Sequence, residues 1–359
     1  MKILLFVDKL YGGGAERVAS ILLNHLCEKH NVTAVIFDDK LPTYPINPLI
    51  KIQKITVNGK IGVLHPIERI AKIRKAIKGN SPDLVISFLV EINRYSIIAN
   101  LHTGYKIILS EHTSIQGKQK IWLYLTRHIL YRFATKVTLL SGSDYKYARW
   151  MRNKTLMYNP LSYSIFKEQS QREKTIVAVS SQKRWHVKGF DLLIQAWAKI
   201  APSNPDWRLQ FIGANNSNYI SEMAKSSGIE NRVDFSGWTN EIDQILRTKS
   251  IYVLSSRREG FPCSLLEAMS QGCACVAFDC KTGPNEIITD GKSGLLAHNG
   301  DINDLAAKLQ RLIDDEQLRQ RLAKGATEEA RRFEKGKIMR QWDDLIDEVT
   351  LNTRKKANT

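Results

Sequence analysis

The sequence predicts a two-domain α/β protein in which each domain is Rossmann-like. Short apolar runs alternate with helical patterns, the alternation stops at a polar, turn-rich stretch (158–174), and it then starts again. Apolar strands that alternate with helices form parallel sheets covered on both faces, so each half predicts its own sheet. The chain of 359 residues is long enough for two domains of about 150 to 180 residues each.

We place the domain boundary at residue 163. The first domain is predicted at 1–163, completed by a C-terminal helix at 338–352, and the second at 164–337. Expected strands of the first domain are 2–8, 32–37, 83–89 and 106–112, with helices at 14–30 and 67–79. The second domain is expected to have strands at 175–181, 207–213, 233–237, 250–256, 273–278 and 293–298, and helices at 189–200, 219–228, 241–249 and from 303 to 350. Ligands of such sheets bind beyond the carboxyl ends of the strands.

The basic charge of the chain is concentrated in its first half. The net charge is +17, and residues 1–163 hold 24 Lys and Arg against 10 Asp and Glu, whereas the remainder holds 29 against 26. A local excess of one sign attracts oppositely charged partners. We therefore expect the first domain to meet whatever acidic surface the protein binds.

The cysteines and the N-terminus predict a cytosolic protein with free thiols. "MKILLFVDK" has too few apolar residues for a signal peptide, and no apolar run approaches the roughly 20 residues that span a bilayer. Four of the five cysteines cluster at 263, 273, 275 and 280. Their spacing matches no zinc pattern, so we expect no metal site there.

A triple-glycine turn follows the first predicted strand. In "DKLYGGGAERV" (8–18), Gly13 and Gly14 let the backbone approach a ligand, and the helix N-terminus behind them favours anions. The stretch is not a GxGxxG motif, which argues against a dehydrogenase. The alternative is a plain tight turn.

Two acids eight positions apart mark the second domain. In "REGFPCSLLEAMSQG" (258–272), Glu259 precedes a Gly-Phe-Pro turn and Glu267 lies in the helix that follows. Ser264 and Glu267 have the spacing of a capping box, which gives Glu267 a structural explanation. The alternative is that Glu267 binds two vicinal hydroxyls of a ribose while the helix N-terminus and nearby arginines bind a phosphate.

These motifs together resemble a known family. "EGFPCSLLEAMSQG" followed by "GPNEIITDGKSGLL" (283–296) is similar to the retaining glycosyltransferases of family 4, which build bacterial lipopolysaccharide, capsule and related glycans. "GGGAERV", "SEH" (110–112), "YNP" (158–160), "KGFDLLIQAW" (188–197) and "FIG" (211–213) also follow in order. The resemblance covers nearly the whole chain and implies the GT-B fold, with two Rossmann-like domains facing each other across a cleft.

The resemblance also implies roles for matching residues. Glu267 is expected to bind the ribose of a nucleotide-sugar, Glu259 to face the donor sugar, Lys188 to contact phosphate, and His112 to reach the donor sugar near the reacting centre. A lone histidine after a strand can equally be structural. Further donor-site residues are Phe261, Pro262, Cys263, Ser264 and Leu265 for sugar and diphosphate, Gly13 and Gly14 for the diphosphate and acceptor side, and Gly213 and Trp238 for the base.

Two of these roles carry open alternatives. The family's arginine stands in a "GRL" stretch, but this chain reads "SSQKRWHVKG" (180–189), so either Lys183 or Arg184 replaces it. Trp238 is expected to stack on the base, or else to be a tryptophan packed into its own loop.

The implied activity is transfer of a hexose or N-acetylhexosamine from a nucleotide-sugar, with UDP favoured, to a lipid-linked saccharide in bacterial surface polysaccharide assembly. The resemblance implies retention of configuration, and the lysine and arginine cations predict catalysis without a metal or other cofactor. Two alternatives stay open. A nucleotide-sugar epimerase of the same fold would act on the donor alone, and a non-catalytic basic protein would bind membrane or nucleic acid but little nucleotide.

A basic and aromatic stretch predicts peripheral attachment to an anionic membrane. "GKQKIWLYLTRHILYRFATK" (117–136) combines cations with aromatic rings, which suits a helix in the membrane interface. The predicted membrane- and acceptor-facing residues are Lys118, Lys120, Trp122, Arg127 and Arg132. "IERIAKIRKAIKGN" (67–80) has the regular apolar spacing of an ordinary surface helix. The protein is therefore expected on the inner face of the cytoplasmic membrane, without a nucleic-acid partner.

Overall fold

The computed structural model describes residues 1–38, 40, 42–56, 64–117, 119–166, 171–214 and 218–357. The chain divides into two compact units, which we call unit 1 (Met1–Ser162 and Lys335–Thr359) and unit 2 (Tyr163–Glu334). The first segment of unit 1 ends one residue before the predicted boundary at 163. Its second segment begins three residues before 338, the predicted start of the C-terminal helix that completes the first domain.

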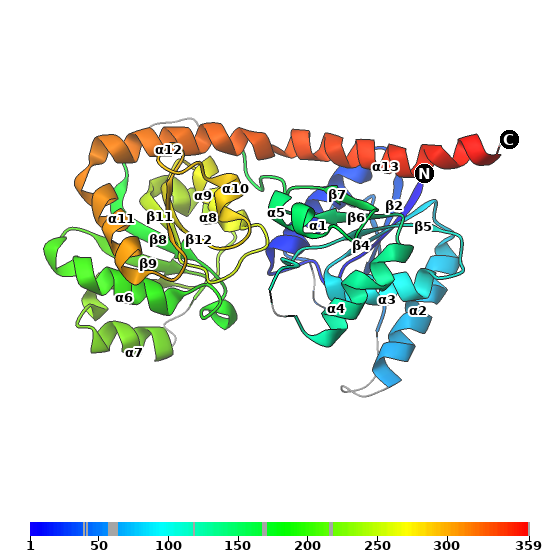
Figure 1. Ribbon diagram of the computed structural model, residues 1–359, viewed down its shortest axis with the longest axis horizontal. Helices are drawn as coiled ribbons and strands as arrows, with labels where there is room; N and C mark the ends of the chain where they lie inside the picture. Colours follow the sequence, from blue (N-terminus) through cyan, green and yellow to red (C-terminus); the bar gives the residue numbers. More distant parts are fainter. Residues whose placement is uncertain are drawn as a thin grey trace. The chain divides into compact units, whose positions relative to one another are not determined.

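Unit 1 is built on a seven-stranded parallel sheet of order β3-β2-β1-β4-β5-β6-β7. Its strands are β1 (Lys2–Phe6), β2 (Asn31–Ile36), β3 (Lys51–Lys54), β4 (Leu84–Phe88), β5 (Lys106–Ser110), β6 (Lys136–Leu139) and β7 (Lys154–Leu156). Its helices are α1 (Gly14–Leu26), α2 (Leu64–Asn80), α3 (Val90–Asn100), α4 (Ile121–His128), η1 (Leu130–Phe133), α5 (Gly142–Tyr147) and α13 (Lys335–Ala357). Helices α2 and α3 lie on one face of this sheet, and α1 and α13 on the other (Figure 1).

Unit 2 contains a six-stranded parallel sheet of order β10-β9-β8-β11-β12-β13. Its strands are β8 (Glu173–Val179), β9 (Arg208–Ile212), β10 (Val233–Ser236), β11 (Lys249–Leu254), β12 (Ala274–Asp279) and β13 (Leu295–His298). Its α-helices are α6 (Phe190–Ile200), α7 (Asn218–Ser226), α8 (Ile242–Thr248), α9 (Cys263–Ser270), α10 (Pro284–Ile287), α11 (Ile302–Asp314) and α12 (Glu316–Ala330), and its 3₁₀ turns are η2 (Gln182–Arg184), η3 (Ala201–Ser203), η4 (Glu230–Arg232) and η5 (Arg331–Phe333).

The predicted fold class of two parallel-sheet α/β domains is confirmed. The central strands are mainly apolar because both of their faces are covered, and every residue of β4 and of β11 is buried. In unit 1 the order of connection reverses between β1 and β4, and in unit 2 between β8 and β11. Such reversals are where open α/β sheets place their ligand sites.

Several elements differ from the prediction. Strands β3, β6 and β7 and helices α3 and α5 had no predicted counterpart. The basic and aromatic stretch 117–136 was expected to be one helix, but it forms α4, then η1, and ends where β6 begins at Lys136. Lys136 pairs with Ile108 of β5, so hydrogen bonding to a neighbouring strand overrides helical propensity there.

Candidate active site

The loops that leave the strands of unit 2 pack backbone against backbone at the point where the sheet order reverses. Gly189 follows β8 at φ +63°, and a Cβ there would lie 1.9 Å from the Ser255 carbonyl oxygen after β11. Gly213 follows β9 at φ +80°, and a Cβ there would lie 2.5 Å from the Ser180 carbonyl oxygen. Both positions require glycine, and together they bring the ends of three strands close to one another.

Lys188 and Glu259 form an ion pair at this reversal. The Lys188 Nζ lies 2.7 Å from the Glu259 Oε1, and the two side chains are only 12% and 7% exposed. Lys188 belongs to the loop between β8 and α6, whereas Glu259 belongs to the loop between β11 and α9. The two residues predicted to contact phosphate and donor sugar are therefore neighbours. Partial burial of a charged pair strengthens its electrostatic interaction compared with water.

The turn after Glu259 leads into α9, whose start differs from the prediction. The N-cap is Pro262, which makes no side-chain capping bond, and Ser264 lies inside the first turn. The Ser264 hydroxyl instead accepts a hydrogen bond from the Tyr252 hydroxyl at 2.8 Å. The predicted capping role of Ser264 is therefore wrong, and with it the capping-box explanation of Glu267. Glu267 is 5% exposed.

The other residues of this turn differ in exposure. Phe261 is buried, and its ring lies 5.3 Å from that of Phe333. Pro262 and Leu265 are buried as well, whereas Cys263 is partly exposed. The amide of Leu265 donates to the Pro262 carbonyl oxygen at 3.1 Å, so this amide of the helix start is already used.

The cations near this loop fall into two groups. Arg257, one of the two arginines before Glu259 that were expected near a phosphate, holds Asp191 with bonds of 2.7 and 2.6 Å and also donates to the His186 carbonyl oxygen. Burial disfavours the Asp191 carboxylate, but Arg257 lowers its pKa overall. Lys183 and Arg184, in η2, are exposed, and their side chains have no partner in the described part of the chain. Arg257 is thus structural, and Lys183 and Arg184 are available for a ligand.

Gly213 and Trp238 lie together at the end of β9 and β10. The amide of Gly213 donates to the carbonyl oxygens of Ser236 at 2.8 Å and Gly237 at 3.2 Å. Trp238, the next residue, is 56% exposed. The alternative of a tryptophan packed into its own loop is therefore wrong.

In unit 1 the carboxylate of Glu16 lies against the glycine turn. Gly12 has φ +81°, Gly13 is the N-cap of α1, and Gly14 is the first helical residue. A Cβ on Gly13 would lie 2.0 Å from the Glu16 Oε2, so the buried Glu16 carboxylate folds back over the start of the helix. An acid here offsets the positive end of the helix dipole. The anion preference expected of this helix N-terminus is therefore met partly by Glu16.

His112 follows β5 and lies between a hydroxyl and an aromatic ring. Its Nε2 is 3.0 Å from the Ser110 Oγ, and its ring stacks on Phe88 with centroids 4.8 Å apart. The Phe88 ring in turn stacks on Trp342 of α13. Burial lowers the His112 pKa to about 4, although the negative charge of Glu111 opposes this shift. The imidazole is therefore neutral at pH 7.

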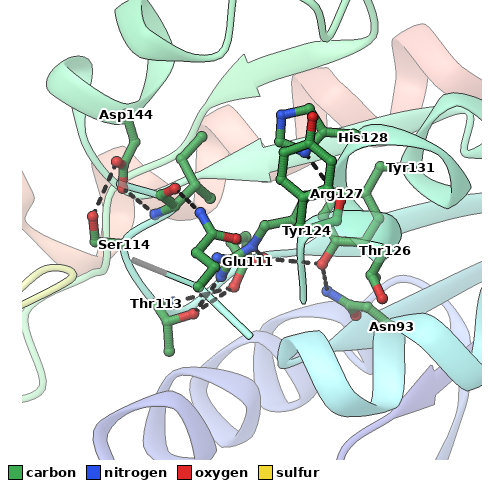
Figure 2. A network of polar contacts seen from close by, with 12 residues as sticks. Asn93, Glu111, Thr113, Ser114, Tyr124, Thr126, Arg127, His128, Tyr131 and Asp144 are labelled. Carbon is green, nitrogen blue, oxygen red and sulfur yellow. Dashed lines mark hydrogen bonds and ion pairs between the residues drawn. The ribbon is translucent and has the colours of Figure 1, made fainter. Parts of the chain in front are cut away.

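Next to His112, Glu111 and Arg127 form a buried salt bridge. The Arg127 Nε lies 3.0 Å from the Glu111 Oε2, and the side chains are 2% and 1% exposed. Tyr131 and Thr113 also donate hydroxyl hydrogen bonds to Glu111, at 3.0 and 2.8 Å. Figure 2 shows Arg127 reaching from α4 to the loop after β5, with Asn93 beside Tyr131. Burial opposes ionisation of Glu111, but Arg127 and these hydrogen bonds lower its pKa overall.

The salt bridge shows that one residue predicted to lie on the surface is buried. Arg127 was expected to face an acceptor or a membrane, but its guanidinium points inward because Glu111 needs a buried counter-charge. Lys120, Trp122 and Arg132 are exposed on α4 and η1 as expected, and Lys118 lies outside the described residues. Sequence reasoning missed the Glu111 cluster, although an acid directly after an apolar strand is a signal that a partner is needed.

The described residues contain neither a metal-binding cluster nor a membrane-spanning helix. No group of three or more His, Cys, Asp and Glu side chains there has a geometry that could hold a metal ion. The five cysteines are free thiols. No helix in the described part of the chain is long and apolar enough to cross a bilayer.

Comparison with known proteins identifies the class. The family model described as "Glycosyltransferase Family 4" matches residues 12–159, and the model described as "Glycosyl transferases group 1" matches residues 163–329. The two models thus cover the two units in turn. The chain belongs to the family 4 glycosyltransferases.

Individual relatives match along most of their length. One is the "GalNAc-alpha-(1->4)-GalNAc-alpha-(1->3)-diNAcBac-PP-undecaprenol alpha-1,4-N-acetyl-D-galactosaminyltransferase" of Campylobacter jejuni, which is 28% identical, with 97% of this chain and 99% of that protein covered. The lipopolysaccharide 1,6-galactosyltransferase of Salmonella typhimurium is 26% identical, with 88% and 90% covered. The structure of Anabaena HepE with UDP has a TM-score of 0.80 at 21% identity, with 97% and 100% covered.

Proposed function

We propose that this glycosyltransferase moves a hexose or N-acetylhexosamine from a UDP-sugar to a lipid-linked saccharide in bacterial surface glycan assembly, with retention of configuration. The observation that carries the proposal is the Lys188–Glu259 pair at the strand-order reversal of unit 2, with Glu267 buried eight residues further on. UDP is proposed as the nucleotide because structurally similar proteins such as HepE were crystallised with UDP. A lipid-linked saccharide is proposed as the acceptor because the name of the Campylobacter relative specifies an undecaprenol-linked glycan.

In this proposal unit 2 binds the donor. Glu267 accepts hydrogen bonds from the ribose hydroxyls, and Glu259 faces the sugar. The backbone of the turn from Phe261 to Leu265 holds sugar hydroxyls and the diphosphate. Trp238, whose ring is exposed, stacks on the base beside Gly213. In unit 1, Gly13 and Gly14 line the diphosphate and acceptor side.

Catalysis requires stabilisation of the leaving nucleoside diphosphate. Lys188 and either Lys183 or Arg184 place fixed positive charge where the diphosphate charge grows, and such preorganised charge is usually the largest catalytic effect. The acceptor hydroxyl attacks on the leaving-group side and gives its proton to a phosphate oxygen. Protein cations supply the charge stabilisation, so no metal is needed.

The exposed face of α4 and η1 is proposed as the membrane-docking surface. Large apolar side chains gather there, each at least 36% exposed: Ile121, Trp122, Tyr124, Leu125, Ile129 and Phe133. The exposed cations Lys120 and Arg132 flank them. Aromatic rings suit headgroup depth, and each cation near an anionic surface adds about 1 kcal/mol.

The donor site is tested by UDP binding and turnover in matched variants. Glu267→Gln should weaken UDP binding about 10- to 100-fold, because it replaces hydrogen bonds to a charged acceptor. Glu259→Gln should remove most turnover, and the exposed Glu230→Gln serves as the control. Normal UDP affinity and turnover in Glu267→Gln would contradict the assignment. Isomerisation of the donor without any acceptor would instead indicate the epimerase.

The membrane surface is tested by flotation with liposomes. The protein should float with vesicles that contain anionic lipid, less so at high salt. Trp122→Ser combined with Lys120→Gln and Arg132→Gln should abolish flotation. Trp238→Ser, which removes a tryptophan of similar exposure in unit 2, should leave it intact. A protein that stays in the soluble fraction at low salt would refute the docking surface.

A further inference from the structure

Three consecutive carbonyl groups in the loop after β8 are held by the chain that follows β11. The Arg257 Nη1 donates to the His186 carbonyl oxygen at 2.6 Å. The Arg257 amide donates to the Val187 carbonyl oxygen at 2.9 Å. The Ser255 hydroxyl donates to the Lys188 carbonyl oxygen at 2.8 Å. The loop that carries Lys188 is therefore tied to the neighbouring loop at each of these residues.

A carboxylate fixes the arginine that makes two of these bonds. The Arg257 Nη1 and Nη2 lie 2.7 and 2.6 Å from the Asp191 Oδ1 and Oδ2, so the contact is bidentate. A planar guanidinium held at both nitrogens is fixed in orientation as well as in distance. Asp191 lies in the first turn of α6, three residues after Lys188. The pair therefore anchors both ends of the segment from His186 to Asp191.

These contacts decide where the Lys188 amine lies. A lysine side chain is a flexible four-carbon stem, so the position of its amine depends on how firmly its backbone is held. The next residue, Gly189, packs so closely that a Cβ there would lie 1.9 Å from the Ser255 carbonyl oxygen. From this backbone the amine reaches the Glu259 Oε1 at 2.7 Å. Glu259 lies two residues after Arg257, so the same arginine anchors both partners of the ion pair.

We propose that Asp191 and Arg257 are positioning residues for Lys188, because they fix the loop after β8 in the place from which its amine meets Glu259. Arg257 then acts on a bound donor through Lys188 and makes no contact with phosphate itself. That the amine serves the leaving diphosphate rests on the proposed function. The positioning rests on contacts within unit 2 alone.

The reactivity of the Lys188 amine tests the positioning without any donor. The full-length protein is treated briefly with acetic anhydride, and mass spectrometry measures the acetylation of Lys188. The side chain is only 12% exposed in the ion pair, so the unmodified protein should react slowly. Arg257→Gln should react at least about fivefold faster, the equivalent of one lost hydrogen bond. Unchanged acetylation in this variant would overturn the proposal.

A second forked pair in unit 2 supplies the control. Arg208 holds both oxygens of Asp234 at 2.6 Å, and it lies at the start of β9, whereas Lys188 follows the end of β8. Arg208→Gln should leave Lys188 acetylation unchanged. Asp191→Asn keeps the size of the side chain and removes the carboxylate, so it should raise acetylation as Arg257→Gln does. Faster acetylation in Arg208→Gln as well would assign the effect to lost stability and overturn the proposal.

Binding of UDP separates positioning from direct contact with phosphate. Asp191→Ala removes the partner of Arg257 and leaves the guanidinium free. Positioning predicts that UDP then binds about fivefold or more weakly, as it should in Arg257→Gln. Arg257→Lys should not restore affinity, because an ammonium group keeps the charge but cannot form the fork. Tighter binding in Asp191→Ala, or unmodified affinity in Arg257→Lys, would show direct contact and overturn the proposal.

The two measurements also separate this positioning from the proposed function. Faster acetylation of Lys188 with unchanged UDP affinity would uphold the positioning and refute the phosphate role of Lys188. Urea unfolding of each variant measures the stability of the fold. A loss of stability with neither change would show that the pair only supports the fold, and the positioning would be wrong.

Discussion

At the scale of single residues, the Glu111–Arg127 salt bridge holds α4 to the loop that carries His112. Arg127→Met should destabilise the protein by about 3 to 5 kcal/mol, because it leaves the Glu111 carboxylate buried without a counter-charge. Replacing both partners, with Glu111→Gln and Arg127→Met, should recover much of this loss. Urea unfolding measures the change, with the exposed Arg132→Met as the control. A double variant less stable than Arg127→Met would contradict the burial of an unpaired charge as the cause.

His112 predicts how stability responds to acid. Its pKa is about 4 in the folded protein, against about 6.5 when unfolded, so the unfolded chain takes up a proton first as the pH falls. Stability therefore falls between about pH 6.5 and 4. From pH 7 to 5 the unmodified protein should lose about 1 to 2 kcal/mol more than His112→Asn. Equal losses in the two proteins would show that folding does not lower the His112 pKa.

The positions of residues were predictable where a motif placed them and not where burial decided them. Lys188 and Glu259 were singled out from their stretches, and they lie in contact. The sequence predicts Arg127 to be a surface cation because its neighbours in sequence are basic and aromatic. Its inward orientation depends on Glu111, sixteen residues earlier, and that pairing exists only after β5 and α4 have packed.

At the scale of elements, glycine at position 189 links the start of α6 to the end of β11. Gly189→Ala should cost at least about 3 kcal/mol, because it combines a left-handed backbone with a clash against the Ser255 carbonyl. Gly228 has nearly the same φ, +66°, but nothing within 4 Å of its Cβ position. Gly228→Ala should therefore cost only about 1 to 2 kcal/mol. Thermal unfolding compares the two, and equal costs would exclude the close approach as the cause.

Strands with long apolar runs were predictable, and short edge elements were not. β4 and β11 are buried throughout, so their sequences are mainly apolar, with Ser87 in β4 and Lys249 and Ser250 at the start of β11 as the polar residues. β3 and β7 span only four and three residues and contain exposed or half-buried positions, so no apolar pattern marks them. Their pairing with β2 and β6 is a property of the assembled sheet. The start of α9 one residue before Ser264 likewise follows from Pro262, whose fixed φ suits the entry to a helix.

At the scale of the whole molecule, the proposed chemistry depends on protein cations. Turnover should therefore be unchanged in excess EDTA, because Lys188 and either Lys183 or Arg184 supply the charge that stabilises the leaving diphosphate. The assay compares treated and untreated protein on the same UDP-sugar. Loss of activity that is restored by Mg²⁺ or Mn²⁺ would show that these cations are insufficient.

The assignment of α13 to unit 1 has a consequence for synthesis. Ile338, Trp342, Ile346 and Val349 are buried, and Trp342 stacks on Phe88. The ribosome makes the whole of unit 2 before it adds this helix, which takes on the order of 10 to 30 s at typical translation rates. During that interval the apolar face under α13 is uncovered. Unit 2, although second in the sequence, is the first to have all of its residues, and the nascent first half must stay soluble until its last helix arrives.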